Sequence, residues 1–188
     1  MKTIVLTGLI SVFAFSAGAQ DTAPIVEVSA QYQLLQADSR PNVPTFTANG
    51  GTLGLAVDFF DQLQGVLELG AAYNGSNLNL KNSLLTYLVG PRVSLRNRAK
   101  RIIPALEVLV GGATAFGGGT NPITLVHLAR NSTGFAMAAG GTLDIRLNHR
   151  IAFRPVQVDY LLTNVDQGRV QNNFRYAAGL VFTFGSQE

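Results

Sequence analysis

Cysteine is absent from this 188-residue chain, and charged residues make up only 13% of it. Without cysteine no disulfide framework can form, so the folded state must be held by hydrogen bonds and packing. The formal net charge of +3 is too small to indicate a nucleic-acid partner. Residues 20–188 also lack any apolar run of the roughly 18 residues that a membrane-spanning helix needs, which excludes a helical membrane protein.

The first 19 residues differ in composition from the rest of the chain. Lys2 precedes a mostly apolar stretch from Ile4 to Ala17, which is too short for a membrane-spanning helix of about 20 residues. Ala17-Gly18-Ala19 has the small-residue pattern of a signal-peptidase site. We therefore expect residues 1–19 to be a secretory signal peptide and residues 20–188 to form a single domain.

Apolar side chains alternate with small or polar ones from Phe174 to Phe184. A period of two residues is typical of a β-strand with one apolar face. Seven other segments alternate in the same way, at about residues 26–34, 52–60, 64–73, 84–96, 103–113, 134–147 and 151–162. Arg154 and Asp159 lie at opposite parity with Pro155 between them, which predicts a β-bulge at Pro155–Val156.

The connections between these eight segments alternate in length. Short connections are predicted at residues 61–63, 97–101 and 148–150, and long ones at about 37–51, 74–83, 114–133 and 163–172. Short turns on one side and long loops on the other are typical of transmembrane β-barrels, in which every backbone group pairs with a neighbouring strand. We predict an all-β fold, an eight-stranded antiparallel transmembrane β-barrel with both termini in the periplasm. A soluble lipocalin-like barrel with inverted faces is the alternative.

Four segments carry a resemblance to a known family: residues 87–92, 104–113, 140–146 and 154–160. On these, residues 20–188 resemble the small OmpA/OmpX-type outer-membrane β-barrel family. The resemblance implies the outer membrane of a Gram-negative bacterium, with outer-membrane lipid as a partner. It also implies a non-enzymatic membrane anchor that presents extracellular loops, for envelope integrity or surface interaction. No surface partner follows from the sequence, and we expect a monomer.

The C-terminal segment resembles the terminal signal that the barrel-assembly machinery recognises during insertion. Gly179, Phe182 and Phe184 carry this resemblance. The match departs from the usual pattern at its tip, because residues 185–188 follow the last aromatic residue.

Charged residues recur at the positions opposite to the apolar face, so they are predicted to point into the lumen. They are Glu27, Asp58, Glu68, Arg92, Arg96, Glu107, Asp144, Arg146, Arg154, Asp159 and Arg175. An eight-stranded barrel has room only for its own side chains or one small ligand, and unpaired charges inside it are costly. We expect a structural salt-bridge network. A narrow path for ions or small solutes is the second hypothesis, and a catalytic carboxylate cluster is the third.

Other candidate sites carry weaker signals. His127 and His149 are the only histidines, and neither reproduces a motif of the lipid- or peptide-modifying outer-membrane enzymes, although His127 is the more plausible centre. Gly117-Gly118-Gly119 lacks the lysine of a phosphate-binding loop and indicates a flexible loop. The basic run at residues 96–101 is expected to be a turn in water. We expect no catalytic, metal or cofactor site and no nucleic-acid partner.

Overall fold

The computed structural model describes residues 25–37, 46–60, 62–75, 80–95, 101–120, 127–166 and 169–185. The predicted signal peptide, residues 1–19, lies outside these ranges, as do Arg96 and the side chain of His127. Within the described ranges no helix is long and apolar enough to cross a membrane.

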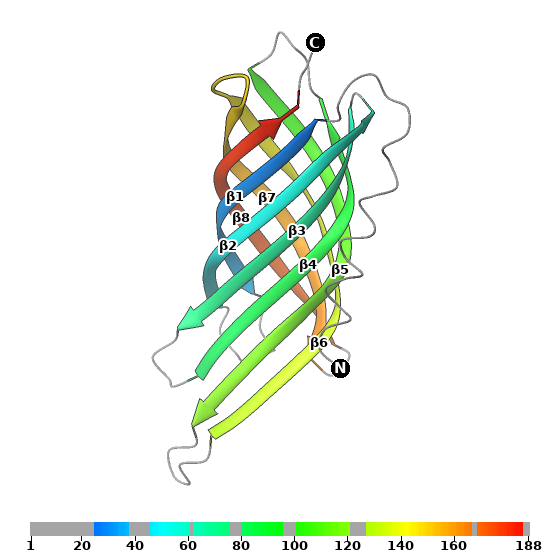
Figure 1. The fold of residues 1–188 in the computed structure, drawn as a ribbon. Helices are drawn as coiled ribbons and strands as arrows, with labels where there is room; N and C mark the ends of the chain where they lie inside the picture. The colour runs from blue at the N-terminus through cyan, green and yellow to red at the C-terminus, as the bar shows by residue number, and fades with distance from the viewer. Residues whose placement is uncertain are drawn as a thin grey trace, which may run out of the picture.

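Eight β-strands form the described fold, one for each alternating segment of the sequence. They are β1 (Val26–Ala37), β2 (Phe46–Phe60), β3 (Leu63–Gly75), β4 (Leu80–Ser94), β5 (Ile102–Thr120), β6 (His127–Arg146), β7 (Ile151–Asp166) and β8 (Arg169–Phe184). Each strand pairs antiparallel with the next, and β8 pairs with β1, so the sheet closes on itself (Figure 1). The predicted eight-stranded antiparallel barrel is confirmed.

The barrel has two mouths. At one of them β1 begins and β8 ends, and the β2–β3, β4–β5 and β6–β7 connections lie there too. We call this the terminal mouth; it is the upper end in Figure 1. The other four connections lie at the opposite end, which we call the distal mouth.

The strands reach further toward the distal mouth than the sequence predicts. The distal connections span only residues 38–45, 76–79, 121–126 and 167–168, so the prediction of long loops is wrong. Gly117-Gly118-Gly119, expected in a flexible loop, lies instead in β5 and pairs with β6. The reason is that main-chain hydrogen bonds between antiparallel strands need no apolar face, so pairing continues where side-chain alternation stops.

The irregularity predicted in the seventh strand is confirmed. The register between β7 and β8 shifts between Arg154 and Gln157, which places the bulge at Pro155–Val156. Proline cannot donate a ladder hydrogen bond, so a bulge is the position in a sheet where it is tolerated. As a result Arg154 and Asp159 both point into the barrel and are fully buried, although their parity differs.

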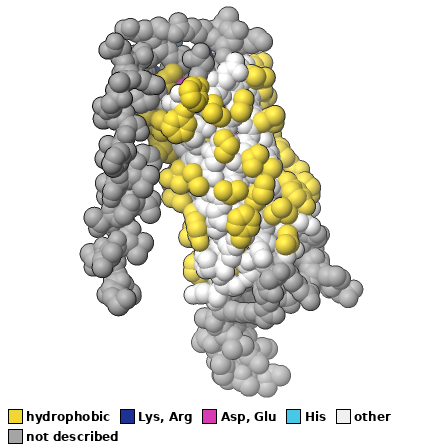
Figure 2. Space-filling view, turned by 90° about the vertical axis from the view of Figure 1, so that its right-hand side faces the viewer, with side chains coloured by type: hydrophobic (Ala, Val, Ile, Leu, Met, Phe, Trp, Pro, Cys, Tyr) yellow, Lys and Arg dark blue, Asp and Glu magenta, His cyan; other side chains and the backbone are white. Residues whose placement is uncertain are grey.

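The two faces of the sheet have opposite character. On β1, for example, Glu27, Ser29 and Gln31 are buried inside, whereas Val28 and Tyr32 are exposed outside. Apolar side chains spread over the outer wall in the view of Figure 2. Toward the terminal mouth, this arrangement inverts the order of a soluble barrel, in which apolar side chains fill the interior.

Two inward glycines bring neighbouring strands very close together. A Cβ at Gly140 would collide with the Asp159 carboxylate and the Val158 carbonyl group, and a Cβ at Gly179 would collide with the Ala30 carbonyl group. Glycine at such inward positions lets the strands coil strongly. No larger side chain fits at these two inward positions without a shift of the neighbouring strand.

Candidate functional site

Side chains fill the lumen in two chemically different regions. One is an apolar cluster, and most of its members belong to the distal parts of the strands. Its buried members are Leu35, Ala48, Ala56, Val66, Ala72, Leu88, Leu109, Ala113, Ala136, Ala138, Leu161 and Val165. Sequence reasoning missed this cluster. Its only signal is the loss of alternation where three apolar residues follow one another, as at Tyr87-Leu88-Val89 and Val108-Leu109-Val110.

The second region contains charged side chains and lies between the apolar cluster and the terminal mouth. One of its ion pairs joins Arg154 on β7 to Asp144 on β6. The Arg154 Nε donates to Asp144 Oδ1 at 2.6 Å, and Nη2 donates to Oδ2 at 2.9 Å. Two parallel hydrogen bonds of this kind hold both side chains in a single orientation. Arg154 shares the inward parity of Ala152, and the Pro155–Val156 bulge brings Gln157 and Asp159 to the same inward face.

Arg175 on β8 joins two carboxylates. Asp159 lies directly opposite it on β7, with 2.6 Å between Arg175 Nη2 and Asp159 Oδ2. Glu68 reaches it from β3, with 2.5 Å between Arg175 Nη1 and Glu68 Oε1. Because β3 and β8 are not neighbours in the sheet, the Glu68 contact crosses the lumen. All three side chains are almost completely buried.

Arg92 and Glu107 form a third ion pair. They face each other across the β4–β5 register, and Glu107 Oε2 lies 2.6 Å from Arg92 Nη2 and 2.7 Å from Arg92 Nε. Arg92 thus engages one carboxylate oxygen of Glu107, Oε2. Its other oxygen, Oε1, accepts a hydrogen bond from Gln157 at 2.9 Å.

Gln157 connects the three ion pairs, and sequence reasoning missed this role. Its side-chain nitrogen lies within hydrogen-bond distance of carboxylate oxygens of Glu68, Glu107 and Asp159, at 3.1, 2.9 and 2.9 Å. Its side-chain oxygen accepts from Arg154 Nη1 at 3.3 Å. An amide offers two N–H donors and one acceptor without adding charge, so it suits a position between carboxylates and a guanidinium group. The signal in the sequence was that Gln157, a polar residue next to the bulge, has the parity of the inward face.

The remaining predicted charges lie nearer the terminal mouth. Gln64 donates to Asp58 at 2.7 Å and to Glu27 at 3.3 Å, so this amide links two further carboxylates. Arg146 is partly exposed at the end of β6. The structure thus brings together most of the charges that the sequence places inside, while Arg96 lies outside the described residues.

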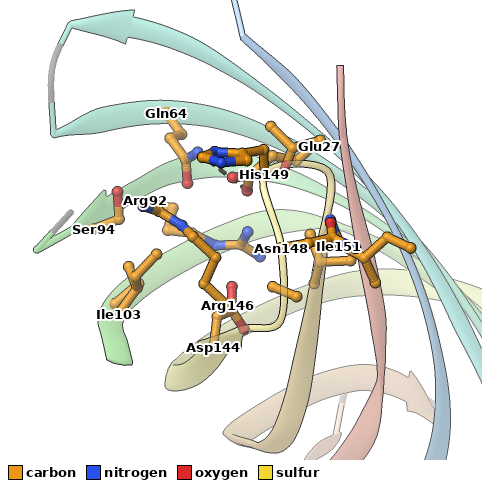
Figure 3. Close-up of a pocket in the computed structure, with 14 residues that line it drawn as sticks. Glu27, Gln64, Arg92, Ser94, Ile103, Asp144, Arg146, Asn148, His149 and Ile151 are labelled. Atoms are coloured by element: carbon orange, nitrogen blue, oxygen red, sulfur yellow. Dashed lines mark hydrogen bonds between the residues drawn. The ribbon is translucent and has the colours of Figure 1, made fainter. Parts of the chain in front are cut away.

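A small recess opens at the terminal mouth (Figure 3). Its cavity volume is about 40 Å³, enough for a few atoms. Its lining includes Arg92, Ser94, Asp144, Arg146 and His149. His149 is exposed in the β6–β7 turn, as its position in a short connection predicts. In the described part of the chain, no group of three or more His, Asp or Glu side chains is placed to hold a metal ion.

The residues of the predicted assembly signal lie on β8 beside β1. Gly179 pairs with Gln31, and Phe182 pairs with Val28. Phe184 is exposed on the outer wall. Recognition by the assembly machinery stays a prediction.

Comparison with known proteins gives a clear result for the fold. No protein-family model matches the sequence, and no curated protein sequence matches it. Among solved structures, neisserial surface protein A is 10% identical over 85% of this chain and 97% of its own, with a TM-score of 0.63. Ail, the attachment invasion locus protein of Yersinia pestis, is 13% identical over 86% and 99%, with a TM-score of 0.62. A major outer membrane protein from Thermus thermophilus is 13% identical over 85% and 99%, with a TM-score of 0.60. This chain has the fold of the small eight-stranded outer-membrane β-barrels, the type to which the OmpA/OmpX-like proteins belong.

Proposed function

We propose that this chain is a non-enzymatic integral protein of the outer membrane of a Gram-negative bacterium. The observation that carries the proposal is the inverted distribution of side chains. Arg154 and Arg175 are buried inside, whereas Leu53, Leu69 and Leu106 are exposed outside. A wall of exposed apolar side chains that encircles a barrel is stable in lipid and not in water.

Aromatic side chains on the outer wall support the same proposal. Phe59, Tyr73 and Phe184 are exposed at or close to the ends of β2, β3 and β8. Tyrosine and phenylalanine are enriched at the two interfaces of transmembrane barrels, where the lipid headgroups meet the hydrocarbon. We therefore propose that the outer wall contacts outer-membrane lipid. We also propose that the protein inserts into the membrane as a monomer.

We propose the role of an anchor that presents the distal connections to the outside. The filled lumen favours an anchor over a pore, because Leu88, Leu109 and Leu161 are buried in the apolar cluster. Two of the similar structures are of proteins named for attachment and for the bacterial surface, which supports surface interaction as the role of the distal connections. The charged region pairs its members internally, an arrangement suited to structure and not to catalysis.

Labelling of single cysteines in whole cells tests the proposed orientation. The chain has no cysteine, so each engineered thiol is unique. A membrane-impermeant maleimide is expected to label Thr47→Cys, Asn131→Cys and Asn172→Cys, which are exposed near the distal mouth. It should not label Gln62→Cys or His149→Cys, which are exposed at the terminal mouth, until the outer membrane is permeabilised. The reverse pattern would overturn the orientation, and equal labelling of both sets in intact cells would argue against membrane insertion.

Conductance in planar lipid bilayers separates the anchor from the pore. We expect no steady open state from the refolded protein, because buried apolar side chains and ion pairs occupy the lumen. Refolding should be checked first by the heat-dependent shift in electrophoretic mobility that intact barrels show. Steady conductance steps from protein that passes this check would favour the small-pore hypothesis.

A further inference from the structure

The terminal recess contains one cation that the ion-pair network does not use. Arg92 is neutralised by Glu107, and Asp144 by the forked contact with Arg154. Arg146 also lines the recess, but its guanidinium group makes no ion pair or hydrogen bond within the described residues. Figure 3 shows Arg146, Arg92 and Ser94 around the same space.

Ser94 supplies a second and independent observation. Its side chain lines the recess and is only 3% exposed, yet its hydroxyl oxygen has no hydrogen-bond partner among the described residues. Buried hydroxyl groups are nearly always hydrogen-bonded in native proteins, so an unpartnered one indicates a bound water or ligand. A guanidinium group only donates hydrogen bonds, and a hydroxyl group can donate as well, so an anion that accepts from both groups satisfies them together.

We propose that the terminal recess binds a small inorganic anion between Arg146 and Ser94, with His149 at its rim. The cavity volume of about 40 Å³ suits a halide or a single phosphate group and is far below that of an organic-ligand pocket, typically about 300–1,000 Å³. Two carboxylates among the described side chains also line the recess, and neither forms an ion pair with Arg146. Asp144 is engaged by Arg154 through both oxygens, and Glu27 accepts from Gln64.

Titration of the refolded full-length barrel with inorganic phosphate, and separately with chloride, tests this site. Ionic strength is held constant with a bulky organic anion that the recess excludes, and binding is followed by calorimetry for phosphate and by chlorine NMR linewidth for chloride. We expect saturable binding of at least one anion. Arg146→Gln should weaken it by about tenfold or more, the order of one charge-assisted hydrogen bond. Ser94→Ala should weaken it by a smaller factor and should not impair folding, because no hydrogen bond is lost.

Arg150→Gln is the matched control. Arg150 is an exposed arginine in the β6–β7 turn, four residues after Arg146, and it does not line the recess. Its replacement should therefore leave the anion affinity unchanged. Equal weakening by Arg146→Gln and Arg150→Gln would mean diffuse attraction to the basic rim and would overturn the proposal. Absence of saturable binding by both anions would also overturn it and would indicate ordered water on Ser94. A bromide peak in anomalous diffraction between Arg146 and Ser94 would support the site directly.

Discussion

Replacing Arg175 by methionine is expected to lower the free energy of unfolding by about 3–5 kcal/mol, the usual cost of removing one partner of a buried ion pair. Arg175 contacts both Glu68 and Asp159, at 2.5 and 2.6 Å. Methionine keeps much of the packing volume, so the loss would report on charge and not on a cavity. The two carboxylates would remain buried and close together, with Gln157 as their shared donor. Urea unfolding from lipid vesicles or micelles, followed by tyrosine fluorescence or by circular dichroism, measures the change.

Two variants control for this prediction. Thr142→Val replaces a buried inward side chain of nearly the same shape without changing its charge, and its hydroxyl group has no hydrogen-bond partner within the described ranges, so it should lower the unfolding free energy much less than Arg175→Met. Adding Glu68→Gln to Arg175→Met removes one of the two stranded carboxylates and should restore part of the lost stability. The interpretation of Arg175 as the centre of the network would be wrong if Arg175→Met cost no more than Thr142→Val.

Arginine on the outer wall is expected to destabilise the inserted barrel according to its depth. Leu69 lies near the middle of β3, and Leu69→Arg should cost about 2–4 kcal/mol, the cost of a cation near the bilayer midplane. Val93 lies next to the end of β4 at the terminal mouth, so Val93→Arg should cost less because its guanidinium group can reach the headgroups. Refolding equilibria in liposomes measure both variants.

Gln62→Arg provides the baseline for that series. Gln62 is exposed and polar in the β2–β3 connection, so an added cation there stays in water. The three substitutions should rank Leu69, Val93 and Gln62 in order of decreasing cost. Equal and small effects at all three positions would favour a barrel that does not meet lipid.

The side on which each side chain lies was predictable from local pattern. A strand places successive side chains on opposite faces, so the parity of Glu27, Glu68 and Arg175 sets them on one face and that of Val28, Leu69 and Tyr176 on the other. The same logic located the Pro155–Val156 bulge, because only an extra residue lets Arg154 and Asp159 share a face. The alternation of side chains did not predict the strand ends at the distal mouth, because strand pairing continues there through residues such as Gly117 and Arg130 that show no alternation.

The amino-acid sequence by itself determined the class of fold, the number of strands and the charged residues that face inward, because these follow from a period of two residues along the chain. Only the tertiary structure decided which charges meet. Glu68 finds Arg175 across the lumen, and Gln157 reaches three carboxylates on β3, β5 and β7, because barrel closure and strand tilt set the relative height of strands that are distant in sequence. The apolar cluster, and the position of Arg146 beside Ser94 at the terminal recess, likewise depend on that closure.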